Sequence, residues 1–508
     1  MLGKKKYQEK LFISFQLSQR VPKDNFYRQL KEALSLGFLY NKVKPYYGSE
    51  GQKSIDPTVF FRIMLIGYLE NIISDRALIE HISMRLDLLY FIDYDIDDTL
   101  PWHSTISRTR KKLPAEIFED LFDKVLGMCV KAGMVNGSSQ AVDSAYIKAN
   151  SSLNSLIEKE AMNTVRQHIQ KVREENDSIP SKDKHAKETP EWKKKEVKQR
   201  HKRQEEKFKG QPGNANRGKY LSNHTHYSPT DPDSRIAVKP GKPRQMYYLS
   251  NMSVDTGGHV ITHIEADYAD LKDSQTLIGF LDNMLPRMYK HELKLTDLLA
   301  DAGYNSGANL KYLEQKGITG YIPPHGQYEK NKQGFIFDAD NNRYICRNGK
   351  FLIYKKTIPD AKGNYFMHYS TRVADCRGCP FGKKCKSKAN ERRLRVTIYK
   401  DYHDRMEDRM QGKIGKRMRK VRQSTVEPVF GTLINFLGMR KINTRGIQHA
   451  HKCMLLSAMT YNLKKYMKYI HKKRGTNLLK INISENSLFN WVFYNIFGQF
   501  QQCFAFTK

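Results

Sequence analysis

The sequence has no long hydrophobic run. None of its segments approaches the roughly 18 consecutive uncharged apolar residues that a membrane-spanning helix needs. The best candidate, Val59 to Leu69, is too short and contains Arg62. The N-terminal lysines Lys4 to Lys6 precede only a few apolar residues, and no small-residue cleavage site follows them. We therefore expect no contact with a membrane and a location in the cytoplasm.

Cysteines are scarce, with seven in 508 residues, which excludes a disulfide framework for a chain in a reducing compartment. Cys129 lies on the apolar face of a predicted helix and is expected in the core. Four others form one cluster whose C-x-x-C pair suits tetrahedral zinc. The alternative is a set of reduced, unligated thiols. The predicted zinc ligands are Cys346, Cys376, Cys379 and Cys385.

Acidic residues are too few to balance the basic ones. The chain has 87 Lys and Arg against 53 Asp and Glu, a net charge of +34. A small anionic ligand needs no such surface, whereas duplex DNA carries one phosphate charge per about 1.7 Å of its axis. Nucleic acid is therefore the expected partner, and the length suggests about three domains.

The N-terminal part is predicted to be helical, because apolar residues recur three and four positions apart. Asp56 and Pro57 should begin one helix, and apolar residues between Ile117 and Val130 should form the buried face of another. A short basic helix capped by Ser104 or Thr105 would present Arg108 and Arg110 to a DNA groove, or only to solvent.

From Gln140 onward the pattern changes to strands alternating with helices. The predicted order is βββαβαβ, a mixed sheet with helices, in which the second and third strands form a hairpin across residues 255–258. A polar segment at 182–209 has twelve basic and six acidic residues, and its composition is typical of a solvated or disordered insertion. A basic helical stretch is predicted from about Arg405 to Tyr469.

Three carboxylates occupy places where this fold would bring them together. Asp143 lies within the first strand, Asp301 ends a short strand, and Glu427 begins an amphipathic helix. Taken singly, each has a structural explanation: a strand-edge Asp, a turn Asp and the last member of a capping box that starts at Ser424. Together they provide the oxygen ligands that two Mg²⁺ ions require for phosphoryl transfer.

Basic residues surround the third carboxylate. On a helix and the loop after it they could contact the phosphates of DNA, although a run of charge is often only a solvated face. The predicted DNA contacts here are Arg419, Arg422, Arg440, Lys441 and Arg445.

The segments around the three carboxylates resemble the signatures of DDE transposases from bacterial insertion sequences. These segments are Ala141-Val-Asp-Ser-Ala145, Ala300-Asp-Ala-Gly-Tyr-Asn-Ser306 and Ser424-Thr-Val-Glu-Pro-Val-Phe-Gly-Thr432. The chain is most similar to the insertion-sequence family called eleven-eighty-two, and the likeness extends through the helical N-terminus. It departs from the broader group at Gln423 and Ile434, where an Arg and a Lys are usual.

The resemblance implies a ribonuclease-H-like catalytic domain in which Asp143, Asp301 and Glu427 hold two Mg²⁺ or Mn²⁺ ions. It also implies double-stranded DNA partners (terminal inverted repeats and target DNA), joining of 3′-hydroxyls to the target, and a place at the bacterial nucleoid. Because two ends have to be joined, we expect at least a homodimer on DNA. The expected domains are a helical DNA-binding domain at 1–136, the first catalytic part at 137–324 with a polar insertion at 178–232, a Cys-rich zinc-binding insertion at 325–400, the completing catalytic part at 401–470 and a tail at 471–508.

Two other functions remain open at this point. A non-catalytic DNA-binding regulator with a zinc module fits the charge and the cysteines equally well, but it would not need all three acids. A nuclease that uses water as the nucleophile fits the acids as well as a transposase does.

Overall fold

A computed structural model describes residues 14–48, 50, 54–158, 221–238, 244–324, 326, 330, 334–360, 363–381, 385 and 390–473. The chain divides into two compact units. We call the first, Met1–Val135 with Asn435–Gly438 and Leu455–Lys508, the helical unit, and the second, Asn136–Ile434 with Met439–Met454, the sheet unit. The predicted polar segment 182–209 and the tail after residue 473 lie outside the described residues.

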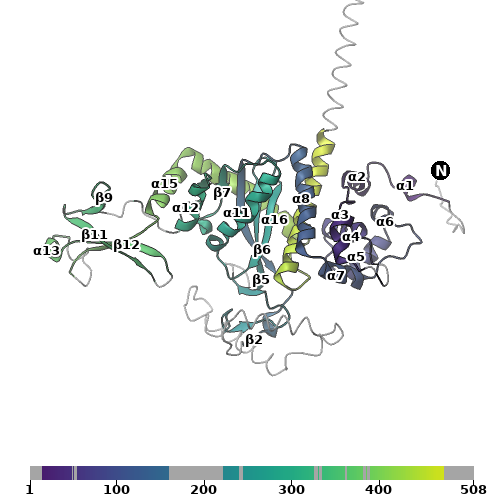
Figure 1. Ribbon diagram of the computed structural model, residues 1–508, viewed down its shortest axis with the longest axis horizontal. Coiled ribbons are helices and arrows are strands. Elements are labelled where there is room, and N and C mark those ends of the chain that lie inside the picture. The colour runs from purple at the N-terminus through teal and green to yellow at the C-terminus, as the bar shows by residue number, and fades with distance from the viewer. Residues whose placement is uncertain are drawn as a thin grey trace, which may run out of the picture. The chain divides into compact units, whose positions relative to one another are not determined.

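The helical unit confirms the helical prediction for the N-terminal part (Figure 1). The Asp56 carboxylate caps its central helix, accepting from the Thr58 and Val59 amides at 2.6 and 3.3 Å, as the Asp-Pro pair predicted. In the last of its N-terminal helices Phe118 and Cys129 are fully buried. The elements are α1 (Leu17–Arg20), α2 (Phe26–Ala33), α3 (Leu39–Val43), the 3₁₀-helix η1 (Lys44–Tyr46), α4 (Pro57–Leu69), α5 (Asp75–Ser83), α6 (Leu86–Ile92), α7 (His103–Lys112) and α8 (Ala115–Lys131).

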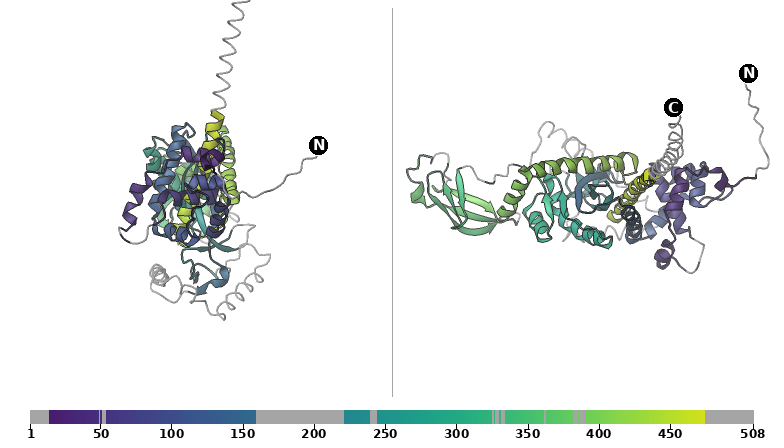
Figure 2. Two further views of the ribbon diagram at one scale, coloured as in Figure 1. Left: turned by 90° about the vertical axis from the view of Figure 1, so that its right-hand side faces the viewer. Right: turned by 90° about the horizontal axis from the view of Figure 1, so that it is seen from above.

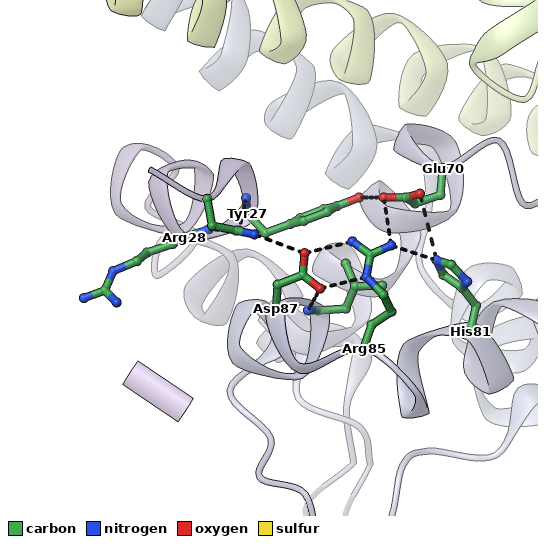
Figure 3. Close-up of polar contacts among 8 residues, drawn as sticks. Tyr27, Arg28, Glu70, His81, Arg85 and Asp87 are labelled. Atoms are coloured by element: carbon green, nitrogen blue, oxygen red, sulfur yellow. Dashed lines mark hydrogen bonds and ion pairs between the residues drawn. The ribbon is translucent and has the colours of Figure 1, made fainter. Parts of the chain in front are cut away.

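A polar network joins four of these helices (Figure 3). The buried Tyr27 hydroxyl of α2 donates to Glu70 at the end of α4. The Arg85 guanidinium binds Asp87 through two bonds of 2.8 Å and lies 3.8 Å from Glu70. Burial raises the pKa of Asp87, but the bonds from Arg85 and Asn25 outweigh it and lower that pKa overall. Each polar group therefore enters the helical packing with a partner.

Removing one hydroxyl tests this network. Tyr27→Phe leaves Glu70 without its buried donor and should reduce the free energy of unfolding by about 1–2 kcal/mol. Tyr40→Phe is a matched control, because Tyr40 donates to Asp56 at 2.6 Å but is 48% exposed, and it should cost less than about 0.5 kcal/mol. Equal losses in a urea titration of the two variants would contradict the network's role.

The sheet unit is built on a six-stranded mixed sheet in the order β4-β5-β1-β7-β8, with β6 pairing β5. The central strand β1 runs antiparallel to β5 and parallel to β7, and β7 is parallel to β8. The predicted hairpin is confirmed as β5 and β6, and so is the βββαβαβ order of the main elements. Their bounds are β1 (Ser139–Lys148), β4 (Arg235–Ala237), β5 (Gln245–Asp255), β6 (Ile261–Tyr268), α11 (Asp273–Lys290), β7 (Asp297–Leu299), η4 (Ala302–Tyr304), α12 (Gly307–Gln315) and β8 (Thr319–Tyr321).

A second, five-stranded antiparallel sheet follows in the order β13-β12-β11-β10-β9 (Figures 1 and 2). One of its faces covers a small core that includes Tyr344, Leu352 and Tyr369. We call it the insertion sheet. It gives the predicted Cys-rich segment an apolar core of its own, which the sequence did not suggest. Its elements are β9 (Phe335–Asp338), β10 (Arg343–Cys346), β11 (Phe351–Pro359), β12 (Tyr365–Ser370), α13 (Val373–Cys376) and β13 (Arg393–Thr397). A two-residue pair, β2 (Ile157–Glu158) with β3 (His226–Tyr227), lies elsewhere in the unit.

The basic helical stretch is not one helix. It consists of α15 (Lys400–Gln411), α16 (Lys413–Phe436) and a helix over residues 447–473, which a loop separates from α16. The prediction that Glu427 begins a helix was therefore wrong: Glu427 lies deep within α16, and the capping-box pattern that starts at Ser424 did not mark a helix start. Ser424 instead bonds the Val421 carbonyl at 3.0 Å. No helix of the described part of the chain is long and apolar enough to cross a membrane.

Candidate active site

The first predicted acid, Asp143, lies in the central strand of the main sheet. Its backbone is paired with Met252 of β5, and β7 pairs with β1 two residues earlier, at Ala141. The side chain is 19% exposed. One carboxylate oxygen accepts from the Ser144 amide at 2.8 Å, and the other accepts from Arg422 Nη1 at 2.8 Å. Asp143 is thus a largely buried carboxylate held by a rigid strand.

The second acid, Asp301, follows β7, the parallel neighbour of β1. It caps the 3₁₀-helix η4, where its Oδ1 accepts from the Gly303 amide at 2.8 Å. The turn explanation for this residue is therefore correct as far as local structure goes. Its charge nevertheless acts on Asp143, whose pKa it raises. The parallel pairing of β1 with β7 brings Asp301, two residues after the end of β7, near Asp143 in the middle of β1.

The third acid, Glu427, reaches the same place from α16. Arg422, five residues earlier on this helix, makes the connection: its Nη2 lies 3.5 Å from Glu427 Oε1 while its Nη1 binds Asp143. The Arg422 side chain is only 12% exposed, whereas Glu427 is 59% exposed. Arg422 thus joins Asp143 and Glu427, and Asp301 lies close enough for its charge to act on Asp143.

A fourth carboxylate, which the sequence reading missed, joins this group. Asp273 at the start of α11 accepts from the Ser144 hydroxyl at 2.6 Å. A side chain at Gly303 would place its Cβ 2.8 Å from Asp273 Oδ2 and 3.0 Å from Asp301 Oδ1. Asp273 and Asp301 therefore flank the same glycine. The sequence offered only a helix-start signal at Asp273, and nothing in it separates a capping Asp from one that faces a site.

The electrostatics of the group follow from its burial. Desolvation raises the pKa of Asp143 to about 6; the Arg422 cation opposes this shift, and the Asp301 charge adds to it. The buried Tyr304 of η4 feels the same charges, because burial and then Asp273, Asp143 and Asp301 raise its pKa well above the usual value. Several carboxylates therefore lie close together, and the Arg422 guanidinium partly neutralises their negative charge.

The predicted metal sites can be compared with the arrangement of possible ligand side chains. Among the residues that the structure describes, no three His, Cys, Asp or Glu side chains are grouped so as to hold a metal ion. For the carboxylates, the chemistry of the donors still fits a divalent cation, since hard oxygen ligands suit Mg²⁺ and Arg422 already supplies positive charge between two of them.

The predicted zinc site is not supported. Cys376 is buried with its sulfur 3.1 Å from the Thr371 hydroxyl, and Cys346 and Cys385 pack against the core of the insertion sheet. Cys379 is half-buried. The physical reason is that this segment folds on apolar packing of its strands, so thiolate ligation is not needed to order it.

The predicted DNA-contacting residues of α7 separate into two kinds. Arg108 is exposed, whereas Arg110 is 2% exposed and bound to Asp75 of α5 through contacts of 2.5 and 3.1 Å. The prediction that Arg110 reaches DNA was wrong, because its charge is used inside the helical packing. The helix also begins one residue before the predicted caps, after Trp102, so that Ser104 and Thr105 lie in its first turn.

The other predicted cations are exposed, with Arg422 as the exception. Arg419 lies on α16, and Arg440, Lys441 and Arg445 lie on the loop after it. We call residues 440–446 the basic loop. Its backbone is fixed to the sheet unit, because Ile442 N donates to the Lys148 carbonyl at 2.8 Å and the Asn150 amide donates to the Asn443 carbonyl at 3.1 Å.

Two buried aspartates fix the far end of the basic loop, and both were missed from the sequence. Asp231 accepts from Gly446 N at 2.9 Å and from the Tyr248 hydroxyl at 2.5 Å. Asp233 accepts from Ile447 N at 3.0 Å. Burial raises the pKa of Asp231 to about 6. The loop thus presents cations to solvent from a backbone that is held at both ends.

Comparison with protein families agrees with this arrangement. A family described as transposase domain (DUF772) matches residues 15–112, which cover most of the described N-terminal helices. A family described as transposase DDE domain matches residues 345–467, which include Glu427 and the basic loop. No curated protein matches the chain. The two family matches, with the acids gathered as described, identify this chain as a DDE transposase of the insertion-sequence type.

Proposed function

We propose that this transposase binds the ends of an insertion sequence of the eleven-eighty-two type, cleaves them and joins the 3′-hydroxyls to target DNA by two-metal-ion phosphoryl transfer. The observation that carries the proposal is that three separate elements bring these acids together: Asp143 and Glu427 share the Arg422 guanidinium, and the Asp301 charge acts on Asp143. A DNA-binding regulator would gain nothing from burying acidic charge in this way, because the charge repels phosphate.

The topology of the main sheet supports a ribonuclease-H-like fold for the catalytic part. Three antiparallel strands, β6, β5 and β1, are followed by two strands parallel to β1, and the first two acids lie on β1 and just after its parallel neighbour β7. The insertion sheet then separates β8 from the helix that carries Glu427. A rigid sheet of this kind holds ligands more precisely than loops do.

We assign the metal-ligand role to the carboxylates of Asp143, Asp301 and Glu427. Bound Mg²⁺ would supply charge to stabilise the attacking and leaving oxygens of the phosphate. Arg422 holds the Asp143 and Glu427 carboxylates near one another, and its guanidinium is the cation of the site best placed to contact a scissile phosphate. Asp273 fixes Ser144, the neighbour of Asp143, through its 2.6 Å bond.

DNA contacts are assigned to the exposed cations Arg108, Arg419, Arg440, Lys441 and Arg445. Six or more neutralised phosphates would make binding fall about 10³-fold or more between 50 and 200 mM salt. Because two ends of an element must be joined, we propose at least a dimer on DNA.

The proposal is tested with end-labelled DNA that carries the element's own ends. Purified full-length protein is incubated with this DNA and Mg²⁺, and both nicked and joined products are scored on a denaturing gel. Joined products support transposition, and cut products alone would indicate a nuclease. Binding without any metal-dependent product would contradict the proposed catalysis.

The hydrogen bond between Asp233 and the end of the basic loop can be tested separately. Asp233→Ala removes the acceptor of Ile447 N, so the loop loosens and DNA affinity should fall about threefold to tenfold, with a shallower salt dependence. Asp233→Asn is the matched control, since it removes the same charge but keeps an acceptor oxygen. If charge alone mattered, both variants would bind DNA more tightly than the wild type, and that result in an anisotropy titration would contradict the role of the loop.

A further inference from the structure

The outer face of the insertion sheet, opposite its small core, combines exposed apolar side chains with arginines. Successive side chains of a strand point to opposite faces of the sheet, and directly paired residues on neighbouring strands point to the same face. The strand register therefore shows which residues face the core and which face outward. Phe337, Tyr344 and Leu352 are cross-strand partners on the core side. The residues next to them therefore point outward. They are Ile336, Arg343, Ile345, Phe351, Ile353 and Lys356 on β9, β10 and β11, and Phe366, His368, Arg393 and Arg395 on β12 and β13.

This outer face is accessible. Ile336 is 70% exposed, Phe351 43% and Ile353 38%. Apolar side chains at such exposure cost solvation free energy, so a cluster of them on a single sheet face indicates a surface that meets a partner.

Two of the outward rings are overlaid by guanidinium groups. The Arg343 guanidinium carbon lies 3.9 Å from the centroid of the Phe351 ring, and that of Arg395 lies 4.0 Å from the Phe366 ring. Arg343 also binds Asp338 at 2.8 Å, and Arg395 lies 3.9 Å from Asp360. These ion pairs therefore help to hold the two guanidinium groups over the rings. A planar cation on an aromatic ring offers a stacking surface that a nucleobase can extend.

The charge of this part of the chain selects the partner. Between residues 335 and 397 there are 15 Lys and Arg and 5 Asp and Glu, a net of 15 − 5 = +10, so this segment has nearly a third of the chain's +34. A second copy of the same positive face would be repelled, whereas a phosphate backbone would be attracted.

We propose that this outer face binds an unpaired stretch of DNA, with bases stacked on the Phe351 and Phe366 pairs and phosphates near the surrounding cations. An unpaired strand fits better than a duplex, because stacking requires open base faces that a closed helix does not offer. The inference rests on DNA being the substrate of the proposed function, and it adds a second contact region whose ligand is the strand opened or left single at a cleaved end.

Binding of single-stranded DNA by the full chain tests this assignment. The probe is a labelled 15-nucleotide thymidine oligomer, titrated by anisotropy in EDTA so that no cleavage occurs, beside a 15-base-pair duplex. Phe351→Ala should weaken binding of the single strand about tenfold and leave duplex affinity within about twofold. Tyr289→Ala is the matched control, since Tyr289 on α11 is also a strongly exposed aromatic, and it should change neither affinity.

Two further variants guard against misfolding. Phe351→Trp keeps an aromatic surface and should retain single-strand binding, and Arg395→Gln, on an exposed side chain, should also weaken it. Unchanged single-strand affinity in Phe351→Ala and Arg395→Gln, equal losses for single strand and duplex, or a changed oligomeric state in Phe351→Ala would each overturn the proposal. Asp301→Asn should bind the oligomer like the wild type, so failure of the proposed catalysis and failure of this surface give different results.

Discussion

Asp143→Asn is expected to reduce Mg²⁺-dependent strand cleavage by about 10³-fold or more while leaving DNA binding intact. The amide is nearly the same shape and can still accept from the Ser144 amide, so the strand should keep its structure. It cannot provide the negative charge that a metal ligand in the proposed site must have. Losing several kcal/mol of transition-state stabilisation corresponds to about three orders of magnitude in rate.

The measurement for Asp143→Asn is the initial rate of nicking on end-labelled element DNA, with DNA affinity measured in parallel. Asp297→Asn is a suitable control, because Asp297 lies at the start of β7 in the same sheet. It is paired with Ser139, the first residue of β1, four residues before Asp143, and its substitution should leave the rate within about twofold. Substantial nicking by Asp143→Asn, within tenfold of the wild type, would remove this residue from the proposed site.

The second large effect is expected from a single methyl group. In Gly303→Ala the new Cβ would lie 2.8 Å from Asp273 Oδ2 and 3.0 Å from Asp301 Oδ1, so one or both carboxylates must move. In the proposed mechanism the acids must be placed to a fraction of an ångström, so we expect the cleavage rate to fall about 10²-fold. The backbone at this glycine does not need a positive φ, so the effect arises at the carboxylates and not from strain in the main chain.

Gly431→Ala provides the matched comparison for Gly303→Ala. Gly431 lies on α16, near Glu427, and nothing would stand within 4 Å of an added Cβ. An alanine within a helix should raise the free energy of unfolding by about 0.5–1 kcal/mol and leave cleavage unchanged. Equal cleavage rates in the two variants would show that Asp273 and Asp301 do not depend on the space at Gly303.

Local signals predicted much of the fold correctly. Asp56 and Pro57 fixed the start of α4, and the alternating pattern with the turn at 255–258 predicted the β5–β6 hairpin. Such signals act over a few residues, which a sequence displays directly. Glu427 is the counterexample, because the capping-box pattern from Ser424 to Glu427 occurs within a helix that begins at Lys413.

Contacts between distant segments could not be predicted in this way. The sequence predicted Arg110 as a surface cation, but it binds Asp75 of α5, which lies 35 residues earlier in the chain. Asp273 and Asp231 each accept from a segment more than 100 residues away, at Ser144 and Gly446, and no local sequence pattern marks either contact. Zinc was predicted at Cys346 and Cys376 because this segment was expected to have little apolar core of its own. The core residues are spread over five strands, so no single stretch of sequence reveals them.

The central claim is that Asp301 is a metal ligand in a site that cuts DNA, and changing the metal preference tests it most directly. We would measure nicking of element ends by Asp301→Cys in Mg²⁺ and in Mn²⁺, with Asp301→Ala beside it. A thiolate is a poor ligand for hard Mg²⁺, which prefers oxygen, and a better one for Mn²⁺. We predict negligible product in Mg²⁺, recovered product in Mn²⁺, and none in either metal for Asp301→Ala. Equal cleavage by Asp301→Cys in both metals, or cleavage by Asp301→Ala, would contradict the claim.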